Sequence, residues 1–203
     1  KKKLINSCTN YGKNTEKEAY KDLFNKSKAF LIDDGEKVVI SRCKNVNLDL
    51  TWDVLFNAFI KAGEKYPQAY VSLVFIPGEG YWFGATPEVF LEKKDGFYMI
   101  DALAGSMPIL GNNNPNWRDK EIEEQGFVSE YIKSVLSSLK ITDYKCEGPE
   151  SIIAGPVWHL RTRFRLKNVP DVEKLIAVLH PTPAVCGTPR NEAYEFINNN
   201  EDH

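Results

Sequence analysis

No stretch of the sequence stays apolar for long enough to cross a membrane or to form the core of a signal peptide. The first ten residues, KKKLINSCTN, turn polar again after two apolar positions. This absence predicts a soluble, cytoplasmic protein without a membrane partner. With 203 residues, the chain is long enough to bury a substantial hydrophobic core, so folding requires no disulfide or metal.

Neither sign of charge is in excess. The chain has 26 lysines and arginines against 28 aspartates and glutamates. Apart from the three opening lysines, the basic residues are scattered, whereas nucleic-acid-binding proteins cluster them. We therefore expect no nucleic-acid partner.

Cysteines are few and far apart: Cys8, Cys43, Cys146 and Cys186. No CxxC pair occurs, and only His180 stands near any of them. This spacing lacks the paired ligands of structural zinc motifs. It indicates reduced thiols in a cytosolic protein.

Apolar periodicity predicts alternating groups of helices and short strands. Helices are expected over residues 15–31, 51–65, 117–139, 171–179 and 190–199. Strands are expected over residues 37–42, 70–76, 80–85, 87–93, 97–105, 151–153 and 157–166. Short turns between the strands of residues 70–105 imply antiparallel pairing in a meander. The predicted fold class is α+β, with helices packed on a mainly antiparallel sheet in a single domain over residues 1–203.

The long helix predicted over residues 117–139 has an apolar stripe that ends in two carboxylates, Glu121 and Glu124. Glu123 is expected to point outward. Two inward carboxylates one helical turn apart suit a hard divalent cation such as Mg²⁺. The alternative is a pair of salt bridges at the start of the helix, where the helix dipole also favours acids.

Lys37 and Glu88 are candidates for proton transfer. Lys37 shares a strand face with Val39 and Ser41, and burial beside apolar neighbours would lower its pKa enough for it to act as a base. Glu88 follows Thr86-Pro87 and precedes apolar residues, so desolvation would raise its pKa and make it a proton donor. The alternatives are a solvated edge lysine and an exposed carboxylate.

The segment at residues 179–190, LHPTPAVCGTPR, combines three prolines with a histidine and a cysteine. Together with five other segments it resembles the chorismate-binding enzymes, and specifically the isochorismate synthases. The other segments are KVVISR, GATPEVFL, ALAGSMP, KEIEEQ and VWHLRTRF. The resemblance implies a pocket wall held rigid by the prolines, with His180 and Cys186 in structural roles.

The resemblance also implies the roles of four acidic and basic residues. Lys37 matches the lysine that activates water for attack at C2 of chorismate, and Glu88 matches the acid that protonates the departing C4 hydroxyl. Glu121 and Glu124 match the first pair of glutamates associated with Mg²⁺. The implied activity is the Mg²⁺-dependent isomerisation of chorismate to isochorismate, a step of menaquinone or siderophore biosynthesis.

Four further positions match the substrate pocket of the family: Gly105, Ser106, His159 and Ala184. Gly105 and Ser106 stand at an Ala-Gly-Thr turn against the substrate, and His159 matches a histidine that lines the pocket; Arg161 and Thr162 beside it are weaker candidates. Ala184 occupies a position where salicylate-forming relatives carry threonine, which favours isochorismate as the released product.

The chain departs from the family pattern at Met107, which replaces an arginine, and at Gln125, which replaces a histidine. The first change removes a cation and is expected to loosen the turn, whereas the second is expected to keep a hydrogen bond. Family members extend beyond both ends of the chain. The catalytic domain is therefore expected to be truncated at its C-terminus, where the second pair of metal-binding glutamates would follow.

Two other functions stay open from the sequence. One is a different product of the same enzyme class, either salicylate or an aminated chorismate. The other is a chorismate-binding module without catalysis, because Met107 and the truncated ends are also what a decayed enzyme would have.

Overall fold

The computed structural model describes residues 14–46, 48, 50–110 and 114–201, and these form two compact units. Of these described residues, the first unit contains those within 14–20 and 42–87, and the second contains those within 21–41 and 88–201. Cys8, the opening lysines and residues 111–113 of the polar loop lie outside the described residues. That residues 1–203 form part of one catalytic domain stays a prediction.

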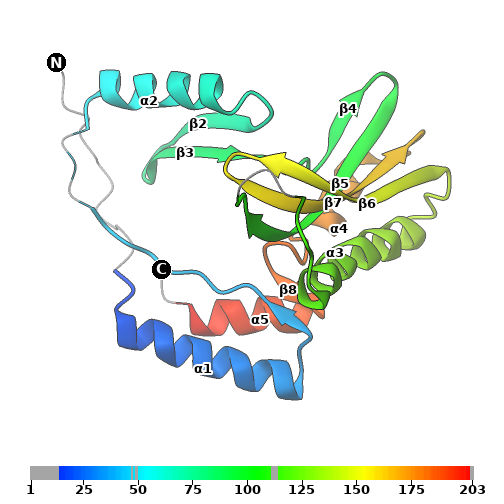
Figure 1. The fold of residues 1–203 in the computed structure, drawn as a ribbon, viewed down its shortest axis with the longest axis horizontal. Coiled ribbons are helices and arrows are strands. Elements are labelled where there is room, and N and C mark those ends of the chain that lie inside the picture. The colour runs from blue at the N-terminus through cyan, green and yellow to red at the C-terminus, as the bar shows by residue number, and fades with distance from the viewer. Residues whose placement is uncertain (1–13, 47, 49, 111–113, 202–203) are drawn as a thin grey trace. The chain divides into compact units, whose positions relative to one another are not determined.

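In the first unit, helix α2 (Trp52–Lys65) packs on a hairpin of strands β2 (Tyr70–Ile76) and β3 (Gly80–Thr86). Thr51 caps α2, because its side chain accepts a hydrogen bond from the backbone N–H of Val54. The Trp52 and Tyr81 rings hold the helix to the hairpin, with their centroids 5.8 Å apart. The predicted helix and hairpin are both confirmed (Figure 1).

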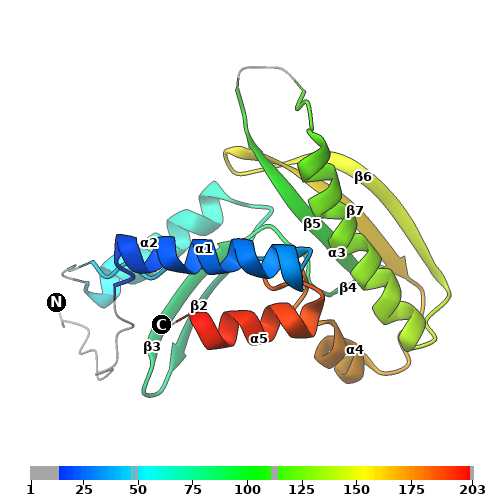
Figure 2. The same ribbon diagram turned by 90° about the horizontal axis from the view of Figure 1, so that it is seen from below.

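The second unit is built on a four-stranded antiparallel sheet in the order β4-β5-β7-β6. Its strands are β4 (Glu92–Lys94), β5 (Phe97–Pro108), β6 (Tyr144–Ala154) and β7 (Val157–Leu166). Helix α3 (Asp119–Ser138) runs along β5 and β7, and α4 (Val172–Leu179) packs against α3 (Figure 2). Together they bury one apolar core, formed by Ile100, Ala102, Ala104, Val128, Ile132, Val135, Leu136, Ile141, Phe164, Leu166, Val169, Leu175 and Leu179.

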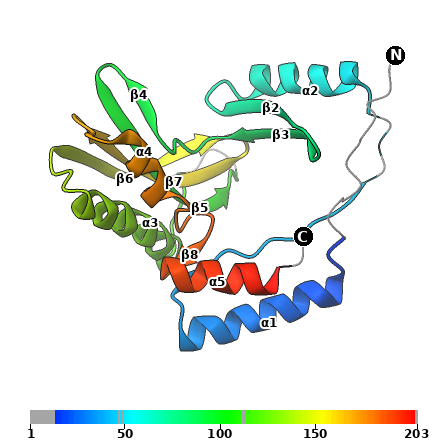
Figure 3. The same ribbon diagram turned by 180° about the vertical axis from the view of Figure 1, so that it is seen from behind.

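A second, smaller cluster holds α1 (Lys17–Asp33) and α5 (Arg190–Asn200) side by side (Figure 3). The rings of Phe30 and Phe196 lie 4.9 Å apart between the two helices. The same cluster buries Cys186, next to the short pair of strands β1 (Lys37–Val38) and β8 (Gly187–Thr188). None of the helices in the described residues is long and apolar enough to cross a membrane.

The α+β class and the antiparallel pairing are confirmed, but the continuous meander is wrong. Strand β3 pairs only with β2, and β4 pairs with β5. Pro87 follows β3 directly and has no N–H to give to a strand ladder, so regular pairing stops there. The strand predicted over residues 87–93 is correspondingly reduced to Glu92–Lys94.

Candidate active site

Lys37 is held between the loop at residues 179–190 and helix α3. Its Nζ donates a 2.7 Å hydrogen bond to the backbone carbonyl of Pro183 and lies 3.4 Å from Oε1 of Glu124. Its side chain is only 10% exposed. Burial lowers the pKa of Lys37, while the nearby Glu124 carboxylate opposes that shift. The expectation that Lys37 avoids bulk water agrees with this position.

Residues 179–190 hold the strand that carries Lys37. Lys37 pairs with Thr188, and the N–H of Val39 donates to the carbonyl of Cys186 over 2.8 Å. Gly187 makes this approach possible, because a Cβ there would lie 2.2 Å from the carbonyl oxygen of Lys37. The loop therefore positions the lysine through its backbone.

Cys186 occupies a packing position, as expected, whereas His180 is exposed and contacts Phe90 at one edge. The His180 ring meets Phe90 edge-on at 5.9 Å between centroids. Cys186 is 2% exposed, and burial raises the pKa of its thiol, which keeps the thiol protonated. Neither side chain has an environment typical of a nucleophile.

Glu88 is half-buried where the chain enters the second unit. The N–H of Asp101 donates to the carbonyl of Val89 over 2.8 Å, which fastens this segment to β5. Burial raises the pKa of Glu88 to about 7, the negative charge of Asp101 adds to the increase, and Lys37 opposes it. The expected desolvation of Glu88 is present, and Lys37 is near enough to act on its charge.

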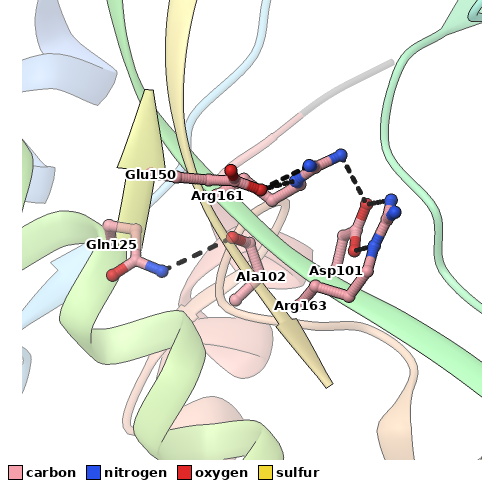
Figure 4. Close-up of polar contacts among 6 residues, drawn as sticks. All are labelled: Asp101, Ala102, Gln125, Glu150, Arg161 and Arg163. Carbon is pink, nitrogen blue, oxygen red and sulfur yellow. Dashed lines mark hydrogen bonds and ion pairs between the residues drawn. The ribbon is translucent and has the colours of Figure 1, made fainter. Parts of the chain in front are cut away.

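A network of charges joins β5, β6 and β7 (Figure 4). One member, Asp101, is near enough to Glu88 to raise its pKa. Asp101, whose side chain is 2% exposed, accepts two 2.7 Å hydrogen bonds from the guanidinium of Arg163. Arg161 reaches both Asp101, at 3.9 Å, and Glu150. Sequence reasoning overlooked Asp101, although a lone acid within the apolar run FYMIDALAG was a usable signal.

The start of helix α3 holds Glu121 almost fully buried, at 4% exposure. The backbone N–H and the side chain of Arg118 both donate to Oε2, over 3.2 and 3.1 Å, and the same guanidinium also bonds Oε1. These hydrogen bonds lower the pKa of Glu121. The residue is therefore an ionised carboxylate inside the protein, and Arg118 is its partner.

Glu124 is half-exposed and Glu123 is exposed, so the helix presents its faces as predicted. Within the described residues, no group of three or more His, Cys, Asp or Glu side chains is arranged to hold a metal ion. Mg²⁺ commonly takes one or two carboxylates and completes its shell with water and substrate oxygens, so two carboxylates one turn apart remain a candidate site. Glu121 and Glu124 are the residues that would hold it.

Gly105 forms a bulge in β5 that brings the strand close to the start of α3. The pairing of β5 with β7 shifts between Ala104 and Ser106, and Gly105 has a φ of +74°. A Cβ on Gly105 would lie 3.2 Å from both the Cβ and the carbonyl oxygen of Glu121. Glycine is therefore required here both for the backbone conformation and for the close approach.

Ser106 and His159 face each other across this bulge. Nδ1 of His159 lies 3.0 Å from Oγ of Ser106 and 3.3 Å from the carbonyl oxygen of Gly105. A carbonyl only accepts, so a protonated Nδ1 donates to Gly105, whereas the closer Ser106 hydroxyl can either accept from Nδ1 or donate to it. Burial lowers the pKa of His159, which favours the neutral ring.

The two departures from the family pattern are accommodated locally. The Nε2 of Gln125 donates to Oγ1 of Thr162 over 2.7 Å and to Oγ of Ser129 over 2.8 Å, so the expected hydrogen bond is retained. Met107 stays in the ladder opposite Trp158, and the expected loosening of this turn stays a prediction. Ala184 is half-buried and packs against the main core.

Residues 2–203 match the family model described as "Chorismate binding enzyme". The chain is 31% identical over 154 residues to the vibriobactin-specific isochorismate synthase of Vibrio cholerae. This match covers 64% of this chain and 39% of that protein. It is 29% identical over 174 residues to the isochorismate synthase EntC of Escherichia coli, covering 80% of this chain and 44% of EntC.

A solved structure has the same fold. It is a putative 2,3-dihydroxybenzoate-specific isochorismate synthase, DhbC, from Bacillus anthracis. The TM-score is 0.77 and the sequence identity is 25%, and the match covers 93% of this chain and 54% of that one. The chain thus spans about half the length of this structure and less than half the length of the two curated relatives. It belongs to the family of chorismate-binding enzymes.

Proposed function

We propose that the protein isomerises chorismate to isochorismate, adding water at C2 and releasing the C4 hydroxyl as water. The observation that carries this proposal is the pair of opposite pKa shifts at Lys37 and Glu88. Burial lowers the pKa of the lysine and raises that of the glutamate to about 7, and each residue influences the charge of the other. Two groups whose pKa values move toward neutrality from opposite sides are suited to act as base and acid.

Lys37 supplies the base. Its neutral amine takes a proton from the water that attacks C2, and the Pro183 carbonyl and Glu124 hold the nitrogen in place during the transfer. Glu88 supplies the acid, since a carboxyl with a pKa of about 7 is mostly protonated in mildly acidic solution and about half protonated at neutral pH. It gives this proton to the departing hydroxyl, so one water enters for each water that leaves.

Mg²⁺, held by Glu121 and Glu124, would neutralise a carboxylate of the substrate and fix its position. Glu121 is suited to this because its carboxylate is ionised and shielded from solvent. Glu124 is suited because it is half-exposed and one helical turn away. The backbone and Cβ of Glu121 lie close to Gly105, which holds the start of α3 against β5.

The proposed pocket wall consists of Gly105, Ser106, His159 and Ala184. In the tautomer that donates from Nδ1 to the Gly105 carbonyl, His159 presents Nε2 as an acceptor for a substrate hydroxyl. Ala184 adds no hydroxyl to the pocket, which supports release of isochorismate instead of salicylate. The names of the relatives support the same product, and a cytoplasmic location belongs to the proposal.

The test is an assay of the purified protein with chorismate and Mg²⁺, with products separated by chromatography. We expect isochorismate from the wild type and a loss of about 10²-fold or more in Lys37→Ala and in Glu88→Gln. Glu123→Gln is the matched control, because it removes an exposed carboxylate from the helix that carries the metal ligands. Circular dichroism verifies that each variant is folded.

Other products would change the conclusion in defined ways. Salicylate or an aminated product would retain the enzyme class and overturn the reaction. Chorismate binding without turnover in the wild type would identify a binding module. Full activity in both Lys37→Ala and Glu88→Gln would remove the acid and base assignments.

A further inference from the structure

Arg118 and Glu121 form an unequal ion pair at the start of helix α3. The Arg118 side chain is 73% exposed, whereas the Glu121 side chain is 5% exposed. Through its backbone N–H and guanidinium, Arg118 donates to both carboxylate oxygens of Glu121. The buried partner is therefore fully engaged by a residue that lies mostly in solvent.

A cation bound by Glu121 has to share or replace these contacts. A buried carboxylate needs a compensating charge, and the forked guanidinium provides it in a geometry that occupies both oxygens. Releasing Arg118 from Glu121 costs little free energy, because its exposed guanidinium regains water when it leaves. Exchange of one cation for another leaves the buried charge compensated throughout.

The other candidate metal ligand has a cation of a different kind. Lys37, the partner of Glu124, is only 10% exposed and is also tied to the Pro183 carbonyl. Its nitrogen cannot move into solvent without breaking that bond and separating from the loop. Of the two basic partners, Arg118 is the one that is free to leave.

We propose that Arg118 competes with the metal for the Glu121 carboxylate: it serves as the counter-ion of Glu121 until Mg²⁺ displaces it. Arg118 thereby lowers the affinity of the site for divalent ions and makes occupancy depend on metal concentration. This inference rests on the metal site of the proposed function.

The experiment measures metal binding alone, without turnover. The purified protein is titrated with Mn²⁺, the free ion is followed by electron paramagnetic resonance, and bound Mn²⁺ is displaced with Mg²⁺. We expect Arg118→Ala to bind Mn²⁺ about two- to fivefold more tightly than the wild type, which corresponds to the worth of an exposed ion pair. Arg118→Lys keeps the charge but loses the fork, so its affinity should fall between the two.

Two further variants make the result specific. Lys120→Ala removes one positive charge from an exposed neighbouring position, so a mere change in the local field would affect it as much as Arg118→Ala. We expect its affinity to stay within twofold of wild type. Glu121→Gln should abolish the binding, which identifies the site.

The outcomes separate this inference from the proposed function. Wild-type binding that Arg118→Ala leaves unchanged would overturn the competition and leave the metal site standing. Weaker binding in a folded Arg118→Ala would show that Arg118 orients Glu121 and does not compete. No Mn²⁺ binding by the wild type would overturn the metal site and, with it, this inference.

Discussion

Lys37 and Glu124 form an ion pair between strand β1 and helix α3, with Nζ 3.4 Å from Oε1. The two side chains differ in exposure, at 10% for the lysine and 35% for the glutamate. Burial disfavours the charged lysine more than Glu124 stabilises it, so the lysine is less basic than it would be in solution while the ion pair keeps its nitrogen in place. The proposed base and metal ligand are thus direct neighbours.

The raised pKa of Glu88 predicts that stability falls as pH increases. Between about pH 4.5, the ordinary value, and about pH 7, the folded state binds more protons at this carboxyl than the unfolded state. The free energy of unfolding should therefore decrease through this interval, by up to about 3 kcal/mol from this group. Urea unfolding at several pH values measures the slope.

The matched variants for this prediction are Glu88→Gln and Glu92→Gln. The first removes the titrating group, so its unfolding free energy should change less over the same interval. Glu92 is an exposed carboxylate on β4, and its amide should leave the wild-type slope unaltered. If Glu88→Gln and the wild type have the same slope, Glu88 does not have a raised pKa.

Gln125 is expected to contribute to stability through Thr162. Replacement of Gln125 by leucine leaves the buried Thr162 hydroxyl and Ser129 without their amide donor, at a cost of about 1–3 kcal/mol. In a double-mutant cycle with Thr162→Val, the two losses should be non-additive by about 1 kcal/mol. Purely additive losses would mean that the hydrogen bond contributes nothing measurable.

Gly105→Ala should be more destabilising than Gly78→Ala. Both glycines have positive φ values, +74° and +87°, so both substitutions impose backbone strain. Only at Gly105 would the new Cβ meet another group, Glu121, whereas nothing lies within 4 Å at Gly78. We expect a cost of about 1 kcal/mol at Gly78 and about 1–2 kcal/mol more at Gly105, measured by thermal unfolding. Equal costs would exclude a close contact between β5 and α3.

Asp101→Asn tests the charge network that joins β5, β6 and β7. The substitution leaves the Arg163 guanidinium without its carboxylate and should reduce stability by about 2 kcal/mol. Adding Arg163→Met should recover part of this loss, because no unpaired cation then stays behind. The single variant should also flatten the pH dependence assigned to Glu88, since Asp101 contributes to the raised pKa of that residue.

The helices were predictable because their signals are local. The apolar stripe through Val128, Ile132 and Val135 is buried as expected, and Thr51 caps α2. Strand β6 was foreseen only over residues 151–153, although it begins at Tyr144. Its first half contains charged residues and Gly148-Pro149, and it becomes a strand through pairing with β7, which no local pattern encodes.

The candidate site was predictable in its residue types and not in its contacts. Lys37 and Glu121 were identified, but their partners were not. Lys37 donates to the backbone carbonyl of Pro183, and Glu121 accepts from Arg118, three residues earlier. A carbonyl carries no sequence signal at all. The Arg118 contact was hidden because the residue at a helix start is usually Ser, Thr, Asp or Asn.

Because Lys37 donates its hydrogen bond to the backbone of Pro183, the backbone path of the loop must be retained, whereas side chains that do not contact Lys37 can differ. The acceptor is a main-chain oxygen, and β1 meets β8 through backbone groups as well. A side chain such as that of Ala184 takes no part in holding the lysine, so it can be exchanged while the base stays in place. Replacing Ala184 therefore changes the surface of the loop and leaves the position of the proposed base unaltered.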